Sequence, residues 1–164
     1  MLPSLEAIKA LNQAGVRYVV VGGLATIAHG FIRFTSDADV VVALDTENAR
    51  KAFEAILSVG FVPAVPVRAE EFADAATREG WIAEKNMMVL NFRLPSDPMQ
   101  SVDVFVKYPL EFEKMYTDSV VSESLEVPTR VCSIDDLIRI KLEAGRPKDL
   151  EDVRNLEIIR EDRA

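Results

Sequence analysis

The sequence contains one cysteine, one histidine and no long hydrophobic run. The single cysteine, Cys132, cannot form an intramolecular disulfide, and one cysteine with one histidine does not support a zinc site. No apolar stretch approaches the roughly 20 residues that a membrane helix requires. The N-terminus also lacks the charged-then-apolar pattern of a signal peptide, so we expect a cytoplasmic protein with no membrane partner.

Basic residues are in the minority, because 19 Lys and Arg face 27 Asp and Glu, which gives a net charge of −8. Nucleic-acid coat proteins bind phosphate through many Lys and Arg side chains, so this charge argues against that class and leaves room only for a local basic pocket. With 49% hydrophobic residues among 164, the chain is long enough to bury a core. We expect one domain over residues 1–164.

Helix and strand signals alternate along the chain. Apolar residues at helical spacing, N-cap residues and closing glycines predict helices over residues 4–15, 22–29, 46–60 and 68–81, and two C-terminal helices within residues 133–161. Valine-rich runs predict strands over residues 18–21, 37–44, 88–94 and 101–107, the last two joined by a turn at 95–98. Residues 119–132 predict one or two short edge strands, because Pro128 is poorly suited to a central strand. This order indicates an α/β (α+β) fold with helices flanking a sheet.

A glycine pair, Gly22-Gly23, follows the first strand and opens a short helix. It is not the dinucleotide-binding fingerprint, because the glycines are adjacent and no third one follows, and it lacks the Lys and Ser/Thr of a P-loop. Two interpretations remain. The pair either lets the helix pack close to the strand or lets phosphate approach the backbone.

Three aspartates stand out in apolar strands. Asp37 and Asp39 are two residues apart, so both side chains project to one face of their strand, and Asp103 is isolated among valines of a later strand. Each alone fits a solvated strand end or a salt bridge. Together they favour a divalent metal with a preference for oxygen ligands, since close carboxylates repel one another without a cation.

Two basic residues are candidates for phosphate contacts. Lys141 occupies the apolar stripe of its helix, where a lysine needs an anion, either a structural carboxylate or a phosphate. Arg33 lies between the glycines and the first aspartates and is either a phosphate clamp or part of an ordinary loop salt bridge. Asp149 and Asp152 begin the last helix, where the helix dipole alone favours acids, and we interpret them as structural.

The glycine pair, the D-x-D motif and the later strand aspartate together resemble the nucleotidyltransferase (DNA polymerase beta-like) superfamily. Two stretches of the sequence, "VVGGLATIAHGFIRFTSDADVVV" and, near the end, "LIRIKLEAGRPKDLEDVRNLE", are similar to the AbiEii-like branch of toxin-related nucleotidyltransferases. The resemblance runs from about Tyr18 to Leu156. It implies a nucleotidyltransferase fold with a mixed central sheet, and C-terminal helices packed on or near the cleft.

The resemblance also implies roles for these residues. Asp37, Asp39 and Asp103 would be the catalytic, metal-binding carboxylates holding Mg²⁺ or Mn²⁺, and Gly22, Gly23, Arg33 and Lys141 would bind the nucleotide. The implied activity is metal-dependent transfer of a nucleoside monophosphate from an NTP to a hydroxyl of an RNA, a protein or a small molecule. A toxin–antitoxin or abortive-infection setting is implied as well. The alternative is a non-catalytic, antitoxin-like module that keeps the fold and binds a toxin or antitoxin partner.

Overall fold

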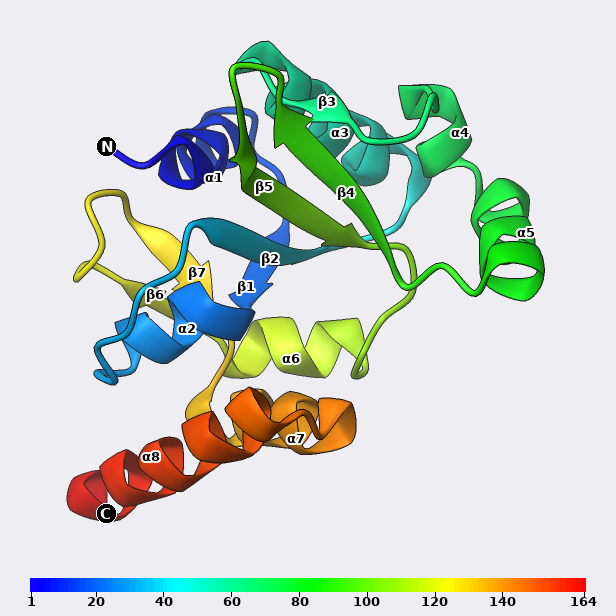
Figure 1. The fold of residues 1–164 in the computed structure, drawn as a ribbon. Helices are drawn as coiled ribbons and strands as arrows, with labels where there is room; N and C mark the ends of the chain where they lie inside the picture. The colour runs from blue at the N-terminus through cyan, green and yellow to red at the C-terminus, as the bar shows by residue number, and fades with distance from the viewer.

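The computed structural model describes residues 1–164 as one seven-stranded mixed sheet with helices on both sides (Figure 1). The strands are β1 (Tyr18–Val21), β2 (Asp37–Val42), β3 (Val62–Pro63), β4 (Val89–Leu94), β5 (Asp97–Phe105), β6 (Val120–Ser122) and β7 (Thr129–Val131). The helices are α1 (Pro3–Gln13), α2 (Gly22–Ala28), α3 (Thr46–Ser58), α4 (Ala69–Ala73), α5 (Ala75–Lys85), α6 (Phe112–Asp118), α7 (Ile134–Ala144) and α8 (Pro147–Arg163). The predicted α/β class with a mixed sheet is confirmed.

The sheet has the strand order β3-β4-β5-β2-β1-β7-β6. At its centre, β2 pairs antiparallel with β1 and parallel with β5. The register sets Asp39 opposite Val21 on one side and opposite Asp103 on the other. Because strand side chains alternate between faces, Asp37, Asp39 and Asp103 share one face of the sheet.

Buried valines form the central strands. All four residues of β1 are buried, as are the last three of β2, and such runs are typical of strands covered on both faces. On one side, α3 packs an aromatic cluster against the sheet, where the rings of Phe53 and Phe92 meet edge to face with centroids 5.1 Å apart. The carboxylates therefore project from a rigid, apolar platform.

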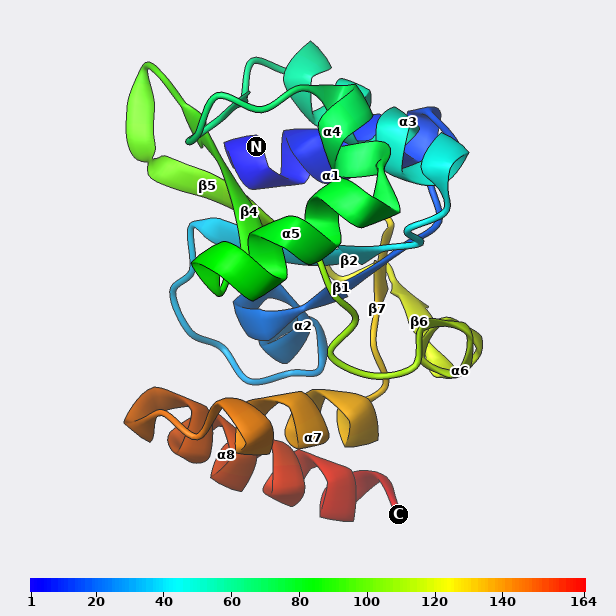
Figure 2. The same cartoon turned by 90° about the vertical axis from the view of Figure 1, so that its right-hand side faces the viewer.

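The α7–α8 hairpin lies on the opposite side of the sheet from α1 and α3 (Figures 1 and 2). Its ends follow the sequence signals. The Ser133 hydroxyl accepts a hydrogen bond from the Asp136 amide at 3.1 Å, Gly145 ends α7 at φ +63°, and Pro147 begins α8. No helix of the chain is both long enough and apolar enough to cross a membrane.

Three element predictions were wrong in detail. The helix expected over 68–81 is two helices that break at Asp74, whose carboxylate caps α5 by accepting from the Thr77 amide at 3.0 Å. The strand expected from residue 101 begins at Asp97, because the hairpin turn spans only two residues. Of the two strands within residues 119–132, only β6 lies at an edge of the sheet, since β7 lies between β6 and β1. Pro128 precedes β7, where its missing N–H breaks no ladder hydrogen bond.

Candidate active site

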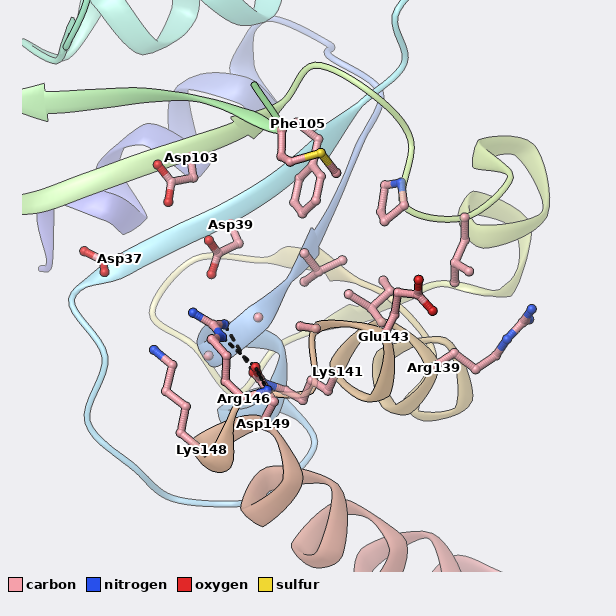
Figure 3. A pocket seen from close by; sticks show the side chains of 18 of the residues that line it. Asp37, Asp39, Asp103, Phe105, Arg139, Lys141, Glu143, Arg146, Lys148 and Asp149 are labelled. Carbon is pink, nitrogen blue, oxygen red and sulfur yellow. Dashed lines mark hydrogen bonds and ion pairs between the residues drawn. The ribbon is translucent and has the colours of Figure 1, made fainter. Parts of the chain in front are cut away.

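One pocket of about 700 Å³ opens at the ends of the central strands. It is bounded by β1, β2 and β5 above, and by α2, α7 and the start of α8 below (Figure 3). Every residue that the sequence singled out for the site lines this one pocket: Gly22, Gly23, Arg33, Asp37, Asp39, Asp103 and Lys141. Chain segments more than a hundred residues apart are thus brought to one cavity.

The three strand carboxylates have different surroundings. Asp37 accepts a hydrogen bond from the Ser101 hydroxyl at 2.9 Å. The Asp103 Oδ1 atom accepts from the Asn91 side-chain amide at 2.6 Å, while its Oδ2 makes no hydrogen bond within the protein. Asp39 has no side-chain hydrogen bond and lies between the other two on the sheet face. Of the three, it is the carboxylate most in need of an external partner.

The electrostatics of Asp39 reflect this lack of a partner. Burial is the largest effect, and together with the nearby carboxylates of Asp103 and Asp37 it raises the pKa of Asp39 to about 6. Lys141 and Arg146 oppose this rise but do not cancel it. Burial likewise raises the pKa of Asp103, against the opposing effect of the Asn91 hydrogen bond. Such raised carboxylate pKa values indicate a site that favours a bound cation.

The donor set fits a hard divalent cation in its chemistry, because carboxylate oxygens are the ligands that Mg²⁺ prefers. The side chains do not enclose an ion as they stand, since no three carboxylate, imidazole or thiolate groups gather around one point. Two of the three carboxylates, those of Asp37 and Asp103, accept hydrogen bonds from residues of the adjacent strands. The carboxylates of Asp37, Asp39 and Asp103 are the residues that could hold a metal here.

The facing wall of the pocket is basic (Figure 3). Although the chain carries a net charge of −8, basic side chains outnumber acidic ones among the pocket residues. Six basic side chains line the pocket as a whole, although Arg139 points away from the carboxylates (Figure 3): Arg33, Lys107, Arg139, Lys141, Arg146 and Lys148. A local concentration of Lys and Arg in a cleft of an acidic protein is suited to an anionic ligand.

Gly22 and Gly23 form the floor between the two walls. Gly22 has φ +69°, and a Cβ added to it would overlap the Asp39 carboxylate, lying 2.8 Å from Cγ. A Cβ on Gly23 would lie 2.9 Å from the Thr35 hydroxyl oxygen. Both glycines are therefore required for close packing against the strand and the following loop, so the packing interpretation holds whether or not phosphate also binds there.

Several pocket residues were not predicted as part of the site. Among the lining residues, Met88, Phe105, Pro109, Leu110 and Ile140 form an apolar part. Asn91 and Ser101 do not line the pocket, but each donates a hydrogen bond to one of its carboxylates. Arg146 and Lys148 were also not among the predicted site residues. Their signal was their position, because cations at the start of a helix oppose its dipole and so indicate another anionic partner.

The fold is shared with solved structures of low sequence identity. The lincosamide antibiotic adenylyltransferase LnuA matches with a TM-score of 0.63 and 12% identity, covering 96% of each chain. The antibiotic-resistance factor ANT(2'')-Ia matches with a TM-score of 0.59 and 13% identity, over 98% of this chain and 88% of that one. An antigenic nucleotidyltransferase-like protein from Paracoccidioides brasiliensis matches at 0.56 and 16%, over 96% and 74%. These likenesses show the nucleotidyltransferase fold.

A sequence comparison with curated proteins gives no match. The profile of one protein family spans nearly the whole chain, from residue 4 to residue 162. That match includes both walls of the pocket and the α7–α8 hairpin. The chain therefore belongs to the nucleotidyltransferase superfamily, in the family described as "Nucleotidyltransferase of unknown function (DUF6036)".

Proposed function

We propose that this protein transfers a nucleoside monophosphate from an NTP to a hydroxyl group of a small molecule. The observation that carries the proposal is the pocket itself, in which three strand carboxylates face a wall of Lys and Arg side chains. A metal–triphosphate complex needs carboxylates for the cation and basic side chains for the phosphates. The pocket volume of about 700 Å³ suits a small-molecule ligand.

The choice of substrates follows the proteins of similar fold. LnuA is described as an adenylyltransferase in a lincomycin-bound structure, and ANT(2'')-Ia is described in complex with adenylyl-2''-tobramycin. Both descriptions name a small molecule rather than a macromolecule. We therefore propose ATP as the nucleotide and a small hydroxyl compound as the acceptor, ahead of the RNA and protein acceptors that the sequence left open.

In the proposed reaction, Asp37, Asp39 and Asp103 would hold Mg²⁺ or Mn²⁺, which when bound neutralises charge on the phosphate oxygens. Arg33, Lys141, Arg146 and Lys148 orient the triphosphate by its oxygens. The free Oδ2 of Asp103 takes the proton of the acceptor hydroxyl. The acceptor oxygen bonds to the α-phosphorus, the bond from that phosphorus to the bridging oxygen breaks, and pyrophosphate leaves.

Two narrower interpretations from the sequence stay proposals. One is that residues 1–164 are a single nucleotidyltransferase domain, with helices 133–161 on its cleft. The other is the AbiEii-like, toxin-related setting, which rests on the sequence motifs alone. The non-catalytic, antitoxin-like alternative differs from an enzyme in one measurable respect, since it binds a partner protein without turnover.

The test is the variant Asp103→Asn. We expect it to lower nucleotidyl transfer by about 10²- to 10⁴-fold, because it removes the proton acceptor and keeps the Asn91 contact. Binding of Mg²⁺–ATP is expected to be weaker but still measurable, because Asp37, Asp39 and the basic side chains of the pocket remain. Transfer is measured with α-labelled ATP and a panel of aminoglycosides and lincosamides, and binding by calorimetry. Wild-type protein that neither binds NTP nor releases pyrophosphate with any acceptor would refute the enzymatic function.

A further inference from the structure

A single buried carboxylate, Asp152 of α8, joins two basic residues of the pocket. The Lys141 ammonium donates a hydrogen bond to Asp152 Oδ2 at 2.8 Å, and the Arg33 guanidinium donates to the same oxygen, also at 2.8 Å. Lys141 and Asp152 are 5% and 4% exposed. Asp149, one turn earlier, lies 3.8 Å from the Lys141 ammonium and hydrogen-bonds Arg146 at 2.6 Å.

Stability alone gives no reason for this arrangement. Burying an ion pair costs desolvation that its attraction only partly offsets, and well-packed apolar residues at such a place are often as stabilising or more so. The helix dipole favours an acid near the start of α8 but does not require it to be buried against two cations. The reason for burying Asp152 against two cations therefore lies in where it places them rather than in the stability that it adds.

Asp152 does not line the pocket, whereas both of its partners do. Arg33 comes from the loop between α2 and β2, and Lys141 comes from the last turns of α7. Two cations that share one carboxylate oxygen are close enough to repel each other strongly without it. The carboxylate therefore fixes where both positive groups stand relative to the cavity.

The same contact anchors the loop that carries Arg33. Ile32 and Phe34 on either side are 82% and 85% exposed, so at this point of the loop the ion pair is the inward contact. Further along, Thr35 packs against Gly23, and the Ser36 hydroxyl donates to the Met99 carbonyl at 3.2 Å. This loop leads directly into Asp37. Asp152 thus connects the C-terminal hairpin to the strand that carries the first two carboxylates.

We propose that Asp152 is a positioning residue, which holds Lys141 and Arg33 where they bind the triphosphate without itself contacting the ligand. The proposal rests on the proposed function, because it concerns the nucleotide of that reaction. It differs from the interpretation of Asp152 as a purely structural helix-start acid. A structural acid contributes to thermal stability alone. A positioning acid also raises nucleotide affinity, and here it does so by holding Lys141 in place.

The experiment measures Mg²⁺–ATP affinity by calorimetry on the full chain, at a temperature where each variant is folded by circular dichroism. We expect Asp152→Asn to weaken ATP binding by about tenfold or more, the loss of roughly one charge-assisted hydrogen bond. The matched control is Asp136→Asn on α7, since Asp136 is also buried, at 5% exposure, and does not line the pocket. Its nearest cation, the exposed Arg139 at 3.8 Å, is too distant for a hydrogen bond, so the carboxylate of Asp136 does not hold a pocket cation as that of Asp152 does. The control is expected to bind ATP like the wild type.

A double variant tests whether Asp152 acts through Lys141. In the Lys141→Met background, Asp152→Asn is expected to weaken binding by only about threefold, through loss of the Arg33 anchor, because the contribution of Lys141 is already gone. This double variant leaves no unpaired charge buried, so it replaces the single variant if Asp152→Asn alone does not fold.

Three results would overturn the proposal. Wild-type ATP affinity in folded Asp152→Asn overturns it and leaves the proposed function intact. Full additivity with Lys141→Met, or an equal loss in the Asp136→Asn control, assigns Asp152 a general structural role instead. A wild-type protein that binds no NTP removes the proposed function itself, which is a distinct outcome because it does not depend on any variant.

Discussion

Gly22→Ala is expected to destabilise the protein by on the order of 2–5 kcal/mol and to abolish nucleotide binding. Gly22 has φ +69°, which costs a residue with a Cβ about 1–2 kcal/mol. The added methyl would also overlap the Asp39 carboxylate, and relieving such overpacking costs about 1–3 kcal/mol more. Relief requires the Asp39 side chain to turn away, so the pocket loses the carboxylate at its centre. Chemical denaturation measures the first effect and calorimetry with Mg²⁺–ATP the second.

Gly15 provides the matched control, since it has φ +68° but a Cβ there would meet nothing within 4 Å. Gly15→Ala is expected to cost only the conformational part, about 1–2 kcal/mol, with ATP binding unchanged. The difference between the two variants isolates the contact with Asp39. In an Asp39→Ala background, the cost of Gly22→Ala should shrink toward that of Gly15→Ala. Equal costs in the wild-type background would show that Gly22 is needed only for its backbone conformation.

This coupling of a glycine to a carboxylate illustrates what the sequence could and could not reveal about the site. The shared face of Asp37 and Asp39 follows from strand alternation and was predicted. That Asp103 lies opposite Asp39 depends on β2 and β5 being parallel neighbours, a pairing across more than sixty residues that periodicity does not encode. The close approach of Gly22 to the Asp39 carboxylate depends on the register of β1 and β2, which the sequence likewise does not reveal.

The basic wall shows the same limit. The position of Lys141 on an apolar stripe predicted that it needs an anion, and it has one, in Asp152. The sequence left open whether that anion is a carboxylate or a phosphate, and the observed ion pair does not exclude a second partner for an ammonium with three donors. Asn91 and Ser101 gave no signal, because a polar residue on a strand has no marked pattern until its cross-strand neighbour is known.

The predicted ends of helices were wrong where a side chain could either continue a helix or cap the next one. Residues 68–81 have helical spacing throughout, but the Asp74 side chain competes with the helix by capping the next one, so the chain forms two helices. Conversely, the observed ends of α7 coincide with clear signals in the sequence, because Ser133 caps its start and Gly145 ends it in the left-handed conformation. Strong end signals were therefore more reliable than periodicity alone.

Asp39→Asn is expected to raise stability at neutral pH while weakening metal binding. The pKa of Asp39 in the folded chain is about 6 against an ordinary value of 3.8, a difference that corresponds to about 3 kcal/mol. The folded state holds the proton more tightly than the unfolded state. The charged carboxylate therefore destabilises the fold. The free energy of unfolding falls progressively as the pH rises from about 4 to about 6, and the full loss applies above that range.

Replacing the carboxylate by a neutral amide of the same shape removes this cost. The expected gain approaches about 3 kcal/mol at pH 8, a rise in Tm of about 6 to 12 °C for a chain of this length, and it vanishes near pH 4. Thermal unfolding of both proteins across this pH range measures it. Asp45→Asn is the comparison for a carboxylate outside the pocket: the amide oxygen can still accept from the Asn48 amide and cap α3, so Tm at pH 8 should change little.

The same titration separates a cation site from an accidental cluster of acids. A metal that binds only the folded state raises Tm by mass action, so Mg²⁺ is expected to raise the Tm of the wild type at pH 8. In Asp39→Asn that increase should be largely absent, since the central ligand is neutral. If Mg²⁺ stabilises both proteins equally, or if Asp39→Asn is the less stable of the two at pH 8, Asp39 is not a strained carboxylate awaiting a cation. The observed crowding of Asp37, Asp39 and Asp103 on one sheet face would then need another explanation.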